Sequence, residues 1–164
     1  MDAREREKRF RGFLFSLVDT KRIASFTLGP YVRGASSGDM DKFLAAYDNF
    51  VAALFQGYFD WYKGEALRVS SSTARSADDV VVSADIVAPN GGRKFRTAFR
   101  VRLDSAGRKV VTDFQFEGAW FALSQRADFT AYLQRHDGDF AGLTAELDKR
   151  TQRFQKDWAP PAGG

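Results

Sequence analysis

The sequence predicts an α+β domain in which N-terminal and C-terminal helices flank a four-stranded antiparallel meander. Two observations carry this prediction. Apolar residues recur with helical spacing over residues 2–62 and 118–154, and they alternate with polar residues over residues 65–118. Turn sequences such as "PNGG" at 89–92 separate the alternating segments, which is typical of strands joined by hairpins. We expect the sheet to curl over a helical layer and form a cone-like domain.

The chain has 164 residues, enough for a single domain with one sizeable core, and no linker divides it. We therefore expect one domain over residues 1–154. A disordered tail is expected over 155–164, because "APPAGG" cannot continue a helix. Aromatic residues make up 15% of the chain, 16 of them Phe, and supply large apolar areas for a core or for a cavity wall.

Composition disfavours several classes of function. The chain has no Cys and one His, which excludes a disulfide framework and argues against a multi-His metal site. The net charge is +4, but the basic residues are scattered and accompany no nucleic-acid motif, so we expect no nucleic-acid binding. No apolar run is long enough to span a bilayer, and Met1 is followed by "DAREREKRFR" rather than by a signal peptide. The chain is therefore either cytosolic or a mature form from which an export signal has been removed.

The longest predicted helix covers about residues 39–62, and its apolar arc is wider than packing on one neighbour requires. One stripe contains Phe43, Tyr47, Phe50, Leu54, Tyr58 and Trp61, and an adjoining stripe contains Leu44, Val51, Phe55, Phe59 and Tyr62. Either the helix is wedged between two neighbours, or one stripe packs on the sheet while the other faces a cavity.

Shorter helices are predicted on both sides of these elements. Residues 2–18 become apolar along their length, and Asp19 is expected to cap a helix over 21–29. After the sheet, helical spacing returns over 118–136 and again behind an expected cap at Asp139.

The predicted strands cover 65–71, 79–87, 94–103 and 109–118. Their alternation gives the sheet an apolar face, formed by Val80, Val82, Ala84, Ile86, Phe95, Thr97, Phe99 and Val101. The opposite face is largely charged, as expected when helices cover only one side of a sheet.

Carboxylates near the sheet are the candidates for catalysis. Alternation directs Asp85 and Asp113 toward solvent on the charged face, and Glu117, at a strand end, is expected to accept backbone hydrogen bonds or to pair with Arg126. His136 precedes a helix end without other metal ligands nearby, and the sequence has no phosphate-binding loop. We therefore assign no catalytic residue, no metal and no cofactor.

Six ordered motifs carry a resemblance to a known family. They are "IASFTLGPYVRGAS" (23–36), "FLAAYDNFV" (43–51), "YKGEALRV" (62–69), "DVVVSADIVAPNGG" (79–92), "KVVTDFQFEGAWFALSQRADF" (109–129) and "DGDFAGLTAEL" (137–147). Over about residues 19–147 the chain resembles the MlaC or toluene-tolerance family of periplasmic phospholipid-binding ABC-transporter auxiliary proteins.

The resemblance implies a monomeric periplasmic carrier, with its signal peptide removed, that shuttles phospholipid. Its partners would be the substrate-binding subunit of an inner-membrane ABC transporter and an outer-membrane lipoprotein complex. The acyl chains would lie in an apolar cavity between sheet and helices. We expect lipid contacts from Tyr47, Phe50, Leu54, Tyr58, Val82, Ala84, Phe95, Thr97, Phe99, Val101, Phe114, Phe116, Ala119, Trp120, Phe121 and Leu123.

Three alternatives remain open at this stage. A hopanoid-associated branch of the family makes a rigid polycyclic lipid a possible cargo. Trp120 and Phe121 are bulkier than the residues that usually follow Glu-Gly in the family, so they cap the cavity, narrow it or fill it. Two other classes of protein also remain open. The first is an enzyme on a cone-shaped fold that uses Glu117 or Asp113 as a base on an apolar substrate, and the second is an adaptor with a filled core.

Overall fold

The structure is a computed structural model that describes residues 3–60 and 63–157. The elements in chain order are α1 (Ala3–Leu17), α2 (Thr20–Thr27), the 3-10 helix η1 (Gly29–Arg33), α3 (Ser37–Asp60), β1 (Ala66–Ser76), β2 (Asp79–Val87), β3 (Arg93–Leu103), β4 (Lys109–Phe116), β5 (Ala119–Trp120), α4 (Phe121–Arg135) and α5 (Phe140–Asp157). The predicted order of helices, meander and helices is confirmed, and the fold is α+β.

The sheet is an antiparallel meander in the order β1-β2-β3-β4-β5. The fifth strand was not predicted because it is only two residues long, and it occupies the start of the segment predicted to be helical. Trp120 pairs with Gln115 and Ala119 pairs with Phe116, so α4 begins only at Phe121. β1 is also longer than predicted, since its polar second half continues to pair with β2 as far as Ser76.

The predicted helix caps are confirmed. The Asp19 carboxylate accepts a hydrogen bond from the Arg22 backbone N–H at 3.0 Å, and the Asp139 carboxylate accepts one from the Gly142 N–H at 2.9 Å. Each cap satisfies a backbone donor that a first helical turn leaves unpaired.

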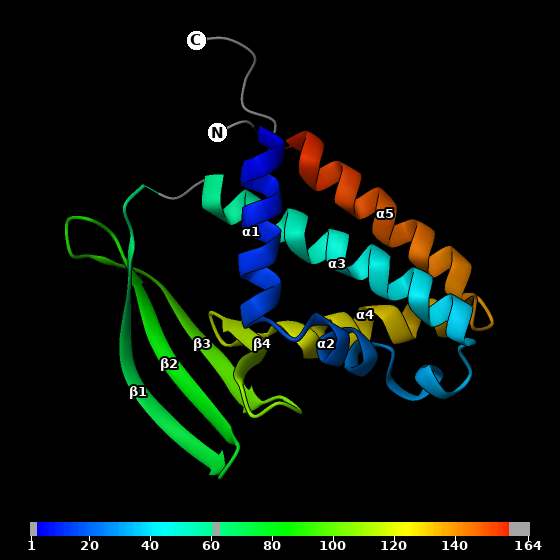
Figure 1. The fold of residues 1–164 in the computed structure, drawn as a ribbon, viewed down its shortest axis with the longest axis horizontal. Coiled ribbons are helices and arrows are strands. Elements are labelled where there is room, and N and C mark those ends of the chain that lie inside the picture. The colour runs from blue at the N-terminus through cyan, green and yellow to red at the C-terminus, as the bar shows by residue number, and fades with distance from the viewer. Residues whose placement is uncertain (1–2, 61–62, 158–164) are drawn as a thin grey trace.

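The helices and the sheet lie on opposite sides of the molecule (Figure 1). The long helices α3 and α5 pack against each other, and α2 and α4 cross beneath them. The sheet leans away from this layer, with β1 farthest from it (Figure 1). The turn after α1 joins the two halves, because the Asp19 N–H donates to the Val111 carbonyl of β4 at 3.0 Å.

The closed core of the protein is helical. The Tyr47 side chain has no exposed area, and its ring packs edge-on against Phe129 of α4 with centroids 6.4 Å apart. Its hydroxyl donates a hydrogen bond to the Gln125 side-chain carbonyl at 2.5 Å. Burial raises the pKa of Tyr47 well above its ordinary value, so the phenol remains a donor. This stripe of α3 is therefore wedged between neighbouring helices, which is the first of the two alternatives for the wide arc.

Some sequence expectations fall outside the described residues. The end of the predicted long helix at 61–62 and residues 158–164 of the tail expected over 155–164 lie there, and so does the side chain of Tyr58. Residues 155–157 of that expected tail belong to α5.

We expect Tyr47→Phe to lower the free energy of unfolding by about 1–2 kcal/mol, because it leaves the buried Gln125 carbonyl without its donor. Urea denaturation measures the loss. Adding Gln125→Met should restore part of it, since no buried polar group then remains unpaired. Equal stability of Tyr47→Phe and the unaltered protein would show that the hydrogen bond does not hold the core.

Candidate functional site

Strand register places the predicted sheet residues on one face. The set comprises Val82, Ala84, Phe95, Thr97, Phe99, Val101, Phe114 and Phe116. Val82 lies opposite Phe99, and Phe99 lies opposite Phe114, so a row of apolar side chains crosses three strands. The predicted composition of this apolar sheet face is confirmed.

The apolar sheet face is exposed in part, since Ala84 and Thr97 are buried and Val82, Phe99, Val101 and Phe114 are half-buried. Phe95 is 40% exposed and Phe116 is 39% exposed, although their rings pack together with centroids 5.0 Å apart. Leu67 and Val69 of β1 pair with residues of the same face and are 55% and 60% exposed. Among the described residues, the main buried cluster takes no side chain from β1 to β4. A domain normally buries the apolar face of its sheet, so this exposed area is the candidate binding surface.

Three aromatic rings connect the apolar sheet face to the helices. Phe114 of β4 stacks on Phe121 of α4 with centroids 4.4 Å apart, and it meets Phe55 of α3 at 5.3 Å. Phe55 belongs to the second stripe of α3, so this stripe, and not the one that carries Tyr47, approaches the sheet. The sequence predicts the second stripe of α3, but Phe55 was not among the predicted lipid-contacting residues.

The remaining predicted site residues are dispersed. Tyr47 and Phe50 lie in the helical core, and Leu54 is half-buried one turn beyond Phe50. Ala119 and Leu123 are exposed where β5 passes into α4, and Trp120 between them is half-buried. Conversely, Leu67 and Val69 were missed as site residues, although the alternation of β1 signals them.

The prediction that Asp113 faces solvent is wrong. Its side chain is buried, and one carboxylate oxygen accepts hydrogen bonds from the backbone N–H groups of Ala122 at 2.9 Å and Phe114 at 2.8 Å. Asp113 thereby caps the first turn of α4, which folds back onto β4. Burial raises the pKa of Asp113, while these hydrogen bonds and the Arg100 charge oppose the increase.

Glu117 has a structural role, as expected. Its backbone is left-handed, with φ 46°, at the turn between β4 and β5. Its carboxylate accepts a hydrogen bond from the Arg96 backbone N–H at 2.7 Å. The alternative partner, Arg126, lies instead over the ring of Phe26, with the guanidinium carbon 4.8 Å from the ring centroid. The Glu117 side chain thus binds the backbone of β3 at the end of β4.

The opposite sheet face is charged, as predicted, and it is tied together by an ion pair. Arg100 donates two hydrogen bonds to the Asp79 carboxylate, at 3.0 and 2.6 Å. These bonds hold the pKa of Asp79 below its ordinary value. The two faces of the sheet therefore differ in chemistry as well as in exposure.

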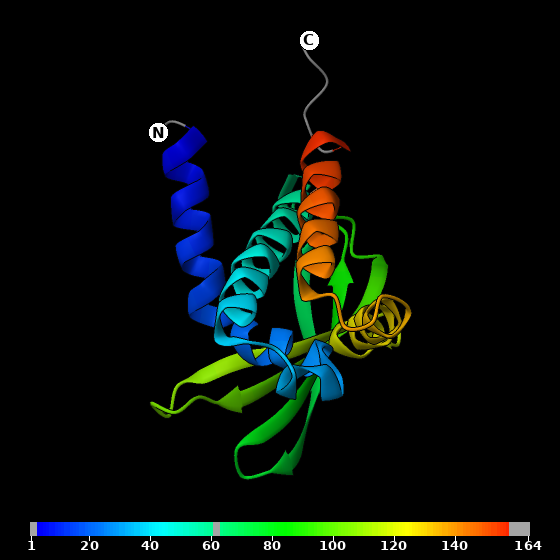
Figure 2. The ribbon, with the colours of Figure 1, turned by 90° about the vertical axis from the view of Figure 1, so that its right-hand side faces the viewer.

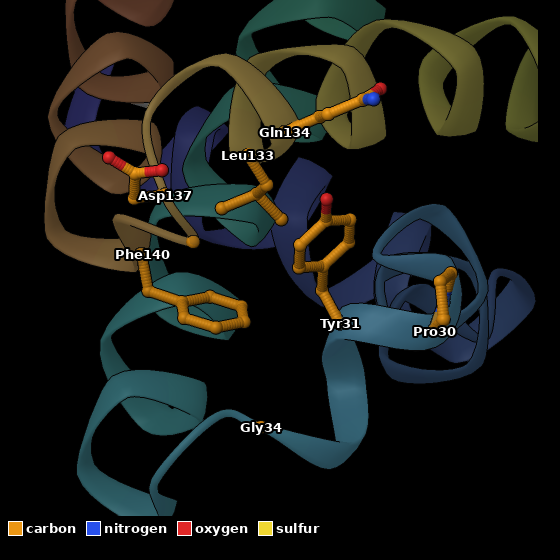
Figure 3. Close-up of a pocket in the computed structure, with 8 residues that line it drawn as sticks. Pro30, Tyr31, Gly34, Leu133, Gln134, Asp137 and Phe140 are labelled. Atoms are coloured by element: carbon orange, nitrogen blue, oxygen red, sulfur yellow. The ribbon is translucent and has the colours of Figure 1, made fainter.

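A separate pocket of about 590 Å³ lies between η1 and the turn from α4 to α5 (Figure 3). The rings of Tyr31 and Phe140 flank it, with Leu133 between them, and the Gln134 amide points away from the space between the rings (Figure 3). None of the predicted site residues lines it. Asp137 is the one carboxylate among the lining residues, so this pocket does not bring an acid and a base together.

The described residues contain neither a candidate metal site nor a candidate membrane-spanning helix. No group of three or more His, Cys, Asp or Glu side chains within 3–60 and 63–157 is arranged to hold a metal ion. In the same part of the chain, no helix has both the length and the apolar character required to cross a membrane.

These features define an α+β domain with a closed helical core and an open apolar sheet face. The family model described as MlaC protein matches residues 1–149, and the chain belongs to this family. A phospholipid-binding protein from Ralstonia solanacearum, solved in complex with a phospholipid, has a similar fold, with a TM-score of 0.74 and 19% sequence identity. The match covers 90% of this chain and 88% of that chain. No curated protein matches the sequence.

We expect Asp113→Asn to be at least as stable as the unaltered protein at pH 7, because the amide oxygen still caps α4 while the buried charge is removed. A raised folded pKa means that the carboxyl favours folding while protonated. That contribution is complete below its ordinary pKa of about 3.9 and is lost as the pH rises through the folded value. The advantage of Asn should therefore grow between acid and neutral pH.

Chemical denaturation across this pH range measures the effect. Asp113→Ala, which removes the cap as well, should lose about 1 kcal/mol at every pH. An advantage of Asn that does not change with pH would contradict the assigned cause.

Proposed function

We propose that this protein is a periplasmic lipid carrier that binds phospholipid acyl chains on the apolar sheet face. It passes the lipid between an inner-membrane transport complex and an outer-membrane complex, and it uses no cofactor or catalytic group. Family membership and the phospholipid bound by the Ralstonia protein support the class of cargo.

One observation carries the proposal: large apolar side chains of the sheet are exposed while the helical core is closed without them. Burial of an acyl chain is worth roughly 0.8 kcal/mol per methylene, so two chains of about 16 carbons represent on the order of 25 kcal/mol gross. Only an extended apolar surface competes with a bilayer for such a molecule. The aromatic junction of Phe55, Phe114 and Phe121 closes one side of that surface.

The arrangement of Trp120 and Phe121 bears on the question of cargo size. Phe121 lies flat against Phe114, so it occupies area that an acyl chain would otherwise cover. Trp120 is half-buried beside it, in β5. This favours a narrowed wall over an empty cavity mouth, and a cargo that contacts mainly β1 to β3.

Native mass spectrometry of the purified protein, followed by organic extraction, tests the proposal. We expect a stoichiometric phospholipid. A hopanoid would keep the carrier function and change the cargo. A protein that remains free of lipid after incubation with phospholipid vesicles would contradict the proposed function.

Val69→Asp should reduce the bound lipid at least about tenfold, because a carboxylate pressed against acyl chains has no partner and is costly to bury. Ser71→Asp is the matched control. Ser71 lies on the same exposed edge strand and pairs with Ser83, on the charged face. Lipid content is measured by mass spectrometry and folding by thermal denaturation. Equal loss in both variants would mean that the apolar sheet face is not the binding surface.

A further inference from the structure

The first helix has an exposed apolar flank that the core does not use. Leu14 of α1 is buried in the helical core, whereas Phe13 is 59% exposed and Leu17 43%. The two exposed residues are four apart and so form one stripe, one turn of helix after the other. We call the exposed stripe of Phe13 and Leu17 the α1 flank.

The α1 flank points away from the long helices. On the other side of α1, Arg11 donates to the Asn49 side-chain carbonyl of α3 at 3.0 Å and lies over the ring of Phe15. Residues two apart on a helix point in nearly opposite directions, so Phe13 is directed away from the side that Arg11 holds against α3. Figure 2 shows α1 at the outer side of the helical layer, leaning away from α3 and α5 toward its N-terminus.

Positive charge is concentrated around this flank. Residues 1–22 contain seven Lys and Arg and four Asp and Glu, so they account for three of the four net positive charges of the chain. Arg9 lies one turn before Phe13 on the same stripe, and Lys21 and Arg22 are exposed at the start of α2, which follows Leu17 in the chain. Lys8 is exposed on the opposite side of α1. Arg9 is paired with Glu5, at 2.9 Å, so the unbalanced charge is carried by the other cations.

An exposed apolar stripe within basic surroundings is the pattern of helices that lie in the interface of an anionic bilayer. We propose that the α1 flank docks the protein on anionic phospholipid membranes, with Phe13 and Leu17 entering the headgroup region and the neighbouring cations facing lipid phosphates. The charge complementarity favours this partner over a second copy of the chain, whose own α1 region carries the same positive charge.

Membrane docking rests on the proposed function only for its biological role, which is to load a lipid carrier. The apolar stripe and the basic segment that support docking do not depend on that function. A carrier that loads from a bilayer needs its apolar sheet face close to the membrane. The turn after α1 is hydrogen-bonded to β4, which belongs to that sheet. Docking through α1 would therefore hold the sheet near the membrane surface while lipid enters.

Co-sedimentation of the full chain with vesicles tests the proposal. We expect binding to vesicles of phosphatidylcholine with roughly 30% phosphatidylglycerol, at least about tenfold weaker binding to pure phosphatidylcholine, and loss of binding in about 0.5 M salt, where exposed charges are screened. Wild-type protein that ignores the anionic vesicles overturns it.

Matched variants locate the surface. Arg9→Glu should weaken vesicle binding several-fold, because it reverses a charge on the same stripe as Phe13, whereas Arg153→Glu, the same exchange at an exposed and likewise ion-paired position of α5, should not. The pair Phe13→Ser and Leu17→Ser should weaken it about tenfold, and Leu103→Ser, at an exposed apolar residue of β3, should leave it unchanged. Equal weakening by Arg153→Glu would assign the binding to overall charge and overturn the proposal.

Lipid content measured in the same samples separates the two proposals. A protein purified without lipid that still binds anionic vesicles contradicts the carrier function alone. A lipid-loaded protein that does not bind vesicles contradicts membrane docking alone. If the Phe13 and Leu17 variant loses its lipid but still binds vesicles, the α1 flank contacts cargo, and the docking proposal is wrong.

Discussion

The junction between β4 and α4 is the constraint on which the rest of the structure depends. Two consecutive residues, Asp113 and Phe114, project from opposite sides of β4 and both hold the helical layer. Asp113 caps the first turn of α4 through the Ala122 N–H, and Phe114 lies against Phe121 and Phe55. The sheet is therefore fastened to the helices at the β4 edge, whereas β1, at the opposite edge, is exposed along its whole length.

Fastening at one edge explains how the domain stays folded with an open apolar surface. The helical core closes on itself, with Tyr47 and Gln125 satisfying each other inside it. The sheet is held by its strand pairing and, on the charged face, by the ion pair of Asp79 and Arg100. Apart from Phe114 at the junction, the helical core takes no side chain from the apolar sheet face, so the rest of that face is available to a ligand without loss of the core.

Sequence reasoning succeeded where the signal was local. Alternation placed Phe95, Phe99 and Phe114 on one face because strand period does not depend on what covers the sheet. The prediction failed for Asp113 because alternation identifies the sheet face on which a residue lies, but does not show that α4 folds back onto that residue. Caps at Asp19 and Asp139 were found because they act within three residues.

Contacts that depend on tertiary neighbours could not be predicted from the period of the sequence alone. The sequence shows that the apolar arc of α3 is wide. Helical period alone does not show which stripe of the arc packs against which neighbour. Tyr47 was therefore assigned to the site and Phe55 left out, although the structure brings Phe55 and not Tyr47 to Phe114 of the sheet. β5 is too short to give any period, and it appears only as pairing with β4.

Exposure of the apolar sheet face links cargo to stability. Full burial of a large apolar side chain is worth roughly 1.5–3 kcal/mol, and the partly exposed side chains of this face forgo part of it, so the ligand-free domain keeps only part of the stability that its sequence could provide. A ligand that binds this face and not the unfolded chain stabilises the folded state in proportion to the logarithm of its free concentration over its Kd. Affinity and folding thus draw on the same side chains. A substitution that improves packing of Phe95 or Phe116 within the protein would raise stability and lower affinity together, because the area that it covers is the area that the lipid needs.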